Sequence, residues 1–345
     1  MATDISDYDY SLPAQSIAQF PIDPPEQAKL MIVSRNGGIL QHRHVADLPS
    51  FIGPNDIVVI NNTKVFRARL FGTLTTPAGF SRSVELFLVR PTQYGWLALA
   101  KPGKHCVPGS TIHIDKAFTA TILSRHEQGT IEVTFNSSVE TVMDTADRIG
   151  HVPVPPYIKT EPTLEAYQTT YAKVQGSVAA PTAGLHLTNN MLDTLKKSGT
   201  TIVEITLHVG LGTFLPVKSP TLESHTMHSE WVHVSQKAAK IITDGKARGK
   251  RIIAIGTTTV RTLEGVAKLH DGQLAPYTGD ISLFITPGFS FSVVDGIFTN
   301  FHLPKSTLLV LVSSYAGREH ILKAYTQAIE NKYRFYSFGD AMLIL

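Results

Sequence analysis

The sequence predicts an α/β protein in which a mostly parallel sheet has helices on both faces and is interrupted by a small inserted β-barrel domain. Three observations predict this fold. Continuous apolar runs of strand length occur in both halves of the chain, and in the second half they alternate with helical patterns. Between the halves, short β-favouring segments separated by turn signals are typical of a small antiparallel barrel.

The first part of the α/β domain is expected at residues 1–62. Its apolar segments, residues 30–33 and 57–60, have no helical partners of their own, so both are expected to join the sheet of the second half. The barrel is expected at residues 63–152. Its strands are predicted at residues 65–71, 83–89, 96–100, 110–114, 120–124 and 130–135.

The second part of the α/β domain is expected at residues 153–345. Capping residues predict helices that begin at Thr163, Thr188 and Ser235, and polar residues 257–259 begin another helix. Residues 306–316 fit either a buried strand or a helix, and the length of the run, with a serine before it and a glycine after it, favours a helix. Further strands are predicted at residues 202–208, 251–255 and 281–285.

Composition excludes several classes of protein. Of the 345 residues 43% are hydrophobic, which is enough for a large core, and the single cysteine, Cys106, excludes a disulfide framework or a multi-cysteine metal centre. The chain does not open with a signal peptide, and no apolar stretch approaches the ~18 to 20 residues of a membrane span. We therefore expect a cytoplasmic protein with no membrane partner.

The distribution of charge permits a polyanionic partner without requiring one. Net charge is +3, yet residues 1–62 carry three basic and seven acidic side chains, so positive charge lies in the rest of the chain. Lys64, Arg67 and Arg69 form a basic cluster at the start of the barrel. This cluster is either an ordinary solvated surface or a contact for nucleic-acid phosphates.

Two segments rich in small residues, 176–186 and 206–214, have the composition of ligand loops. The first lets backbone amides approach a ligand just before a helix, although a tight packing crossover is the alternative. The second follows a strand, where α/β sheets bind ligands, although its histidine fits a core position equally well. The candidate residues in the two segments are Thr182, Gly184, His186, His208, Gly210 and Gly212.

The segment 225–230 places two histidines near a carboxylate. If it is extended, His228 and Glu230 lie on the same face and form a plausible acid–base pair. A zinc site is disfavoured because the segment lacks both the HExxH spacing and a third ligand at a standard spacing.

Three further segments, 256–264, 299–307 and 333–342, carry polar residues that are either structural or part of a site. A glycine fingerprint of dinucleotide-binding proteins or methyltransferases is absent from the sequence, as is a Walker sequence. The candidate residues in the three segments are Thr258, Arg261, Asn300, His302, Arg334 and Asp340.

Taken together, these segments resemble one known family. The stretches GSVAAPTAGLH, TLHVGLGTF, HTMHSE, GTTTVRTLE, TNFHLPKST and YRFYSFGDAM, in this order, are similar to the S-adenosylmethionine:tRNA ribosyltransferase-isomerases of queuosine biosynthesis. The resemblance covers essentially the whole chain and is weakest from about residue 72 to residue 150. It implies the fold described above, an α/β domain interrupted by a small barrel.

The resemblance also implies a reaction. The ribosyl part of S-adenosylmethionine is transferred to 7-aminomethyl-7-deazaguanine at the wobble position of tRNA and isomerised to epoxyqueuosine, with release of adenine and methionine. S-adenosylmethionine is then a consumed substrate, and no cofactor and no metal are expected. We expect a monomer whose partners are tRNA and S-adenosylmethionine. A catalytically inactive tRNA-binding paralogue is the alternative.

This chemistry requires proton transfer, because the aminomethyl cation must lose a proton before it attacks and a proton beside the sulfonium must be removed. The candidates for proton transfer are His186, His208, His228, Glu230 and His302, and of these we predict that His186, His228 and Glu230 are catalytic. Substrate contacts are predicted for Thr182, Gly184, His208, Gly210, Gly212, Thr258, Arg261, Asn300, His302, Arg334 and Asp340, and tRNA contacts for Lys64, Arg67 and Arg69.

One segment departs from the family pattern. Where the family has an arginine followed by Ser-Arg before an apolar strand, this chain has Pro25 and then Lys29. Lysine lacks the planar fork that holds a carboxylate or phosphate with two bonds, so substrate binding would weaken if the position contacts substrate. The alternative is a surface support for the N-terminal segment.

Overall fold

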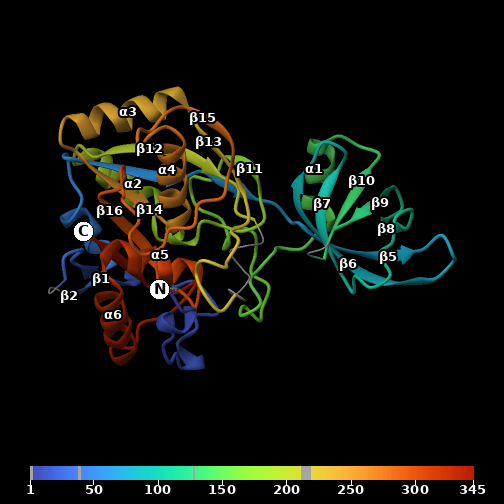
Figure 1. Cartoon of the computed structure of the whole chain (residues 1–345), viewed down its shortest axis with the longest axis horizontal. Coiled ribbons are helices and arrows are strands. Elements are labelled where there is room, and N and C mark those ends of the chain that lie inside the picture. The colour runs from blue at the N-terminus through green and yellow to red at the C-terminus, as the bar shows by residue number, and fades with distance from the viewer. Residues whose placement is uncertain (1–2, 38–39, 127–128, 211–218) are drawn as a thin grey trace.

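The computed structural model describes residues 3–37, 40–126, 129–210 and 219–345. Figure 1 shows two bodies, a large sheet covered by helices and a small barrel that projects from one side of it. Nine strands in the described ranges form the large sheet. In spatial order they are β15 (Tyr277–Ile281), β13 (Glu230–Val234), β12 (Thr201–Leu207), β3 (Asp56–Asn61), β14 (Arg251–Ile255), β16 (Gly296–Asn300), β17 (Ala341–Ile344), β1 (Lys29–Val33) and β2 (Leu40–His44).

The sheet is mixed, so the prediction of a mostly parallel sheet is wrong. At its centre β12, β3, β14 and β16 are parallel, and β17 is parallel to β1. The pairs β15–β13, β13–β12, β16–β17 and β1–β2 are antiparallel. The edge strand β2 is largely exposed, and the other edge strand, β15, contains a glycine and an aspartate. Edge strands with a solvated side need no continuous apolar run, so the apolar pattern revealed mainly the centre of the sheet.

Helices cover both faces of the sheet, as the sequence predicts. Alternate side chains of the central strands point to opposite faces: Val59 and Ala254 pack with helices α3 to α6, whereas Val58 and Ile253 pack with α2 and a short 3-10 helix, η4. The α-helices are α1 (Val139–Ile149), α2 (Asn189–Lys197), α3 (Gln236–Ala247), α4 (Thr257–Leu269), α5 (Thr307–Ala316) and α6 (Arg318–Glu330). The 3-10 helices are η1 (Ile5–Tyr8), η2 (Ala14–Ser16), η3 (Pro25–Gln27), η4 (Val45–Ser50) and η5 (Thr182–His186). Within the described ranges, a helix with the length and apolar character of a membrane span is absent.

The barrel has its own core, and its two chain connections to the sheet start from neighbouring strands. Its strands, in the described residues, are β5 (Arg69–Thr75), β6 (Ser81–Pro91), β7 (Trp96–Lys101), β8 (Thr111–Asp115), β9 (Phe118–Arg125) and β10 (Thr130–Phe135). The chain enters from β3 and returns to β12, which pairs with β3, and the strands β4 (Thr63–Val65) and β11 (Val174–Ser177) pair between the two bodies. The chain therefore leaves and rejoins the sheet at neighbouring strands. The domain boundaries after residues 62 and 152 stay a prediction.

Three predicted elements are wrong. The strand predicted at residues 65–71 is divided, because β4 ends at Val65 and β5 begins at Arg69. A helix after Thr163 is not formed, because residues 163–173 make turns instead. There the side-chain amide of Gln168 bonds both the N–H and the carbonyl of Val65 in β4, at 3.0 and 3.1 Å, so tertiary contacts override a weak helical pattern. The strand predicted at residues 281–285 is shifted, since β15 ends at Ile281. Residues 307–316 form helix α5, which confirms the helical interpretation of that run.

Lys29 supports the end of helix α6. Its ammonium donates to the carbonyls of Asn331 at 2.7 Å and Lys332 at 3.2 Å, just after the helix ends, and lies 5.2 Å from the centre of the Tyr333 ring. A cation is favourable at a helix C-terminus. These contacts favour the interpretation of position 29 as a support for the N-terminal segment.

Candidate active site

A cavity lies at the edge of the sheet where the central parallel strands end. Gly256 follows β14, Asn300 ends β16, and Val209 lies shortly after β12; all three residues line the cavity. This is the edge at which α/β proteins bind ligands. The cavity volume is about 180 Å³. Its lining segments are residues 179–183, 256–258, 299–304, 306–308 and 336–337, together with Tyr157, Tyr167 and Val209.

Asn300 links three of the predicted site segments. Its Oδ1 accepts a hydrogen bond from Thr182 Oγ1 at 3.0 Å, and its Nδ2 lies 3.3 Å from Nε2 of His186 and 3.5 Å from the carbonyl of Asp340. An amide Nδ2 is a donor, so the ring nitrogen of His186 accepts. Burial lowers the pKa of His186 to about 4, which keeps the ring neutral. His186 lies behind Asn300 and is not part of the cavity wall.

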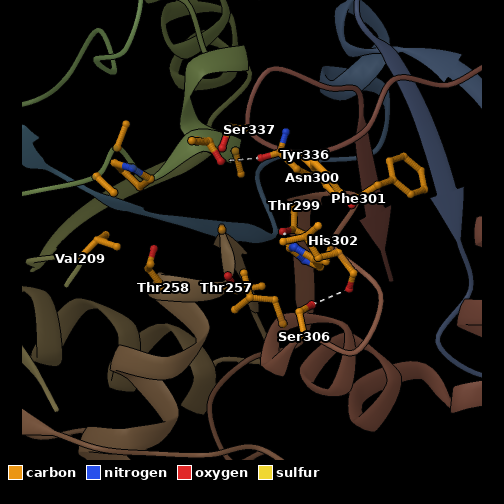
Figure 2. Close-up of a pocket in the computed structure, with 18 of the residues that line it drawn as sticks. Val209, Thr257, Thr258, Thr299, Asn300, Phe301, His302, Ser306, Tyr336 and Ser337 are labelled. Carbon is orange, nitrogen blue, oxygen red and sulfur yellow. Dashed lines mark hydrogen bonds between the residues drawn. The ribbon is translucent and has the colours of Figure 1, made fainter. Parts of the chain in front are cut away.

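His302 is the histidine on the cavity wall (Figure 2). Its backbone is held on both sides by tyrosines, because its N–H donates to Tyr325 Oη at 2.9 Å and its carbonyl accepts from the hydroxyl of Tyr10. Its Nε2 lies 3.2 Å from Thr299 Oγ1. Burial lowers the pKa of His302 to about 3, so its imidazole is unprotonated at neutral pH and able to accept a hydrogen bond.

Glu230 and Arg261 form a buried ion pair beside the cavity. The carboxylate of Glu230 accepts from Arg261 Nη1 and from the N–H of Gly210 at 3.3 Å, and Arg261 Nε donates to the carbonyl of Leu283 at 3.2 Å. The two side chains are 4% and 6% exposed. The pair joins β13 to helix α4, and neither residue lines the cavity.

The predicted pairing of His228 with Glu230 is not present. Strand β13 begins at Glu230, which is buried, whereas His228 precedes the strand and is exposed. The physical reason is that Arg261, 31 residues further along the chain, already neutralises the carboxylate. Neither His228 nor Glu230 contacts the cavity in the described structure.

Other candidates of the small-residue segments pack within the protein. His208 stacks on Trp231 with 4.9 Å between ring centres, and its Nδ1 lies 2.8 Å from Thr63 Oγ1; burial lowers its pKa to about 4. A Cβ on Gly184 would collide with the side chain of Tyr171, so that glycine permits close packing. Gly210 has open space beside its Cα, and Gly212 lies outside the described residues.

Asp340 and Arg334 organise the C-terminal segment. The carboxylate of Asp340 accepts from the N–H groups of Lys29 at 2.9 Å and Arg334 at 2.8 Å. Burial raises the pKa of Asp340, and these backbone donors act against the rise. The guanidinium of Arg334 donates to the carbonyls of Phe20 and Phe338. Both residues hold the loop that brings Tyr336 to the cavity.

Sequence reasoning missed several residues of the cavity wall. The aromatic members are Tyr157, Tyr167, Phe301 and Tyr336, and the hydroxyl members include Thr257, Ser306 and Ser337. Tyr157 Oη lies 2.7 Å from Ser337 Oγ. For Phe301, Tyr336 and the three hydroxyl residues, the available signal was their position in the segments that carry the family resemblance. Aromatic residues alone are equally typical of a core. In the described ranges, His, Cys, Asp and Glu side chains do not form a group of three or more that would hold a metal ion.

Comparison with known proteins places these observations in a family. The family model described as queuosine biosynthesis protein matches residues 5–344. The S-adenosylmethionine:tRNA ribosyltransferase-isomerase of Thermotoga petrophila is 44% identical over 99% of both chains, and that of Heliobacterium modesticaldum is 46% identical over 98% of both. The crystal structure of the S-adenosylmethionine tRNA ribosyltransferase from Thermotoga maritima matches with a TM-score of 0.58 and 34% identity, over 98% of this chain and 100% of that one.

Proposed function

The chain belongs to the queuosine biosynthesis family of S-adenosylmethionine:tRNA ribosyltransferase-isomerases, and we propose that it is an enzyme of this activity. It transfers the ribosyl part of S-adenosylmethionine to 7-aminomethyl-7-deazaguanine at the wobble position of tRNA and isomerises it to epoxyqueuosine. Adenine and methionine are released. We further propose that it acts as a cytoplasmic monomer, with S-adenosylmethionine consumed as a substrate and without a resident cofactor.

The observation that carries this proposal is the convergence of the family segments on one cavity. Five of the six stretches that resemble the family contribute to its wall, although they are spread over more than 150 residues of sequence. Figure 2 shows Thr257 and Thr258 at the start of one helix, Ser306 at the start of another, and Asn300 and His302 between them and Ser337. Packing of a hydrophobic core common to the family would not require polar residues from all these stretches to surround a cavity.

We propose that His302 is the proton acceptor of the site. It is the one histidine among the described residues of the cavity wall, and its backbone is fixed by Tyr10 and Tyr325. Asn300, held by Thr182 and His186, is proposed to contact substrate with fixed orientation. Because His186 and Glu230 are occupied by protein partners, we propose that they position this wall and do not transfer protons.

Mass spectrometry of wobble nucleosides tests the function. A strain in which this gene is deleted should accumulate 7-aminomethyl-7-deazaguanine in tRNA, and the returned gene should clear it. Purified protein mixed with S-adenosylmethionine and substrate tRNA should release adenine. Methyl transfer would be indicated by tritium from a labelled methyl group on the tRNA, and that result, without adenine release, would contradict the proposal.

We propose that tRNA approaches along the junction between the barrel and the sheet. Val65 in β4 packs in one cluster with Tyr167 and Ala180, which line the cavity, so the backbone of neighbouring Lys64 lies close to the site. Within the described residues the Lys64 ammonium has no hydrogen-bond or ion-pair partner. Arg69 instead pairs with Glu85 at 2.8 Å, and Arg67 donates to the carbonyl of Asp147 at 3.0 Å.

Affinity for tRNA is therefore expected to fall with salt, and to depend on Lys64 more than on Arg69. Lys64→Met should lower the slope of log affinity against log salt by ~0.7 to 0.9, the effect of one lost phosphate contact. Arg69→Met, the matched change at an arginine already neutralised by Glu85, should lower it less. Filter binding at salt concentrations from about 50 to about 200 mM measures these slopes for the wild type and both variants. An unchanged slope for Lys64→Met would place the tRNA contact elsewhere.

A further inference from the structure

The start of helix α4 presents backbone N–H groups at the cavity wall. Its N-cap is Gly256, which has no side chain to accept hydrogen bonds from the first turn. The first N–H groups of a helix have no partner within the helix and carry a partial positive charge. Helix α5, whose start also lines the cavity, differs because Ser306 Oγ accepts from Leu309 N at 3.2 Å. Of the two helices, α4 is the one with no side-chain cap.

The hydroxyl of Thr258 is a second, independent observation at the same place. Thr258 is 9% exposed and lines the cavity, and its Oγ1 is without a hydrogen-bond partner in the part of the chain that the structure describes. Figure 2 shows this hydroxyl directed away from the helix, toward the space between Val209 and Ser337. A buried hydroxyl without a hydrogen-bond partner is costly in free energy, so the Thr258 hydroxyl indicates a ligand atom that accepts its hydrogen bond.

Gly256 keeps the space before the helix open. Its φ is +85°, a conformation that favours glycine. A Cβ added there would lie 3.5 Å from Thr258 Oγ1 and 3.7 Å from the Cβ of Ala183, which are ordinary contact distances. A side chain would thus fill the space that a ligand oxygen needs to reach both the hydroxyl and the N–H groups. None of the described lining residues is an aspartate or a glutamate that would repel an anion.

We propose that the start of α4, with Thr258 Oγ1, binds the carboxylate of the methionine part of S-adenosylmethionine. This inference rests on the proposed function. A cavity of about 180 Å³ is smaller than the ~300 Å³ of a site that encloses a whole drug-sized ligand, so it holds one part of this substrate. The carboxylate is the anionic part of S-adenosylmethionine, and an uncapped helix start selects an anion. A tRNA phosphate is the other source of an anion, and the test separates the two.

The test compares S-adenosylmethionine with decarboxylated S-adenosylmethionine. Calorimetry with the full-length enzyme in the absence of tRNA should show that the wild type binds S-adenosylmethionine about a hundredfold more tightly than it binds the decarboxylated ligand. This is the scale expected when a charged group that accepts several hydrogen bonds is removed. Thr258→Val should weaken S-adenosylmethionine by about tenfold and leave the affinity for the decarboxylated ligand unchanged. Thr262→Val is the matched control, because its Oγ1 donates to the Thr258 carbonyl at 3.0 Å and it does not line the cavity.

Equal wild-type affinity for the two ligands would overturn the assignment, and so would an equal loss for both in Thr258→Val. If Thr258→Val weakens tRNA binding and not S-adenosylmethionine binding, the anion is a phosphate and the assignment is wrong. Failure of the wild type to bind either ligand, both alone and in the presence of tRNA, would overturn the proposed function itself, which distinguishes the two failures. A melting temperature of Thr258→Val similar to that of Thr262→Val would show that the Thr258 variant is folded.

Discussion

Replacement of His302 by asparagine is expected to lower turnover by about 10²- to 10⁴-fold, the usual scale for losing a positioned acid or base. Asparagine is smaller than histidine and lacks Nε2, the ring nitrogen that lies 3.2 Å from Thr299 Oγ1, so this hydrogen bond is lost as well. The backbone contacts of residue 302 to Tyr10 and Tyr325 do not depend on its side chain. The lost element is therefore the imidazole ring on the cavity wall.

Steady-state kinetics of adenine release should show the loss mainly in kcat, with a small change in KM. That pattern identifies an interaction made in the transition state, whereas a rise in KM alone would indicate general substrate binding. His228→Asn is the comparison variant, since His228 is exposed and off the cavity wall. A large loss in His228→Asn with full activity in His302→Asn would reverse our assignment and restore the prediction made from the sequence. Thermal melting of both variants separates catalysis from unfolding.

The centre of the fold was predictable because its signal is local. The strands β3 and β14 each contain a run of four consecutive buried apolar residues, and the barrel strands are short β-favouring segments separated by turn residues. Strand direction was less predictable, since whether β13 runs parallel or antiparallel to β12 depends on the path of the chain and not on strand composition. Edge strand β2, with its exposed polar side chains, gives no apolar pattern at all.

The site was predictable as a set of segments and not as a set of roles. Shared small and polar stretches identified the segments that meet at the cavity. A role, however, depends on which partner each side chain finds in three dimensions. Glu230 is buried against Arg261, and Gly184 is packed under the side chain of Tyr171. In each contact the two residues are separated in the sequence. Sequence spacing alone contains no information on such partners.

Three histidines with lowered pKa values make the folded protein sensitive to acid. Burial lowers the pKa of His186 and His208 to about 4 and that of His302 to about 3, from an ordinary value of 6.5. Below pH 6.5 the unfolded chain therefore binds protons that the folded chain does not bind. The stabilisation by these neutral rings is fully present above pH 6.5 and is lost as the pH falls toward about 4 and 3.

The free energy of unfolding should then fall steeply below neutral pH. Each ring contributes about 1.4 kcal/mol per pH unit once the unfolded form is protonated, so three give about 4 kcal/mol per pH unit below about pH 6. A total stability of about 5 to 15 kcal/mol would be exhausted within a few pH units, and we expect acid unfolding near pH 4. Urea unfolding at about pH 7, 6, 5.5 and 5 measures how the free energy of unfolding changes with pH.

His208→Asn provides the decisive variant, because His208 is half-buried against Trp231 and does not line the cavity. It should remove about one third of the slope, about 1.4 kcal/mol per pH unit, even if it lowers stability at pH 7 through the lost stacking. His233→Asn makes the same chemical change on the exposed side of β13, where the ring contacts Thr278 Oγ1 at 2.7 Å, and serves as its control. A wild-type slope of less than one proton between pH 6 and 5, or a His208→Asn slope equal to that of the wild type, would mean that these rings are protonated in the folded protein. That outcome would also remove the neutral imidazole on which the proposed role of His302 depends.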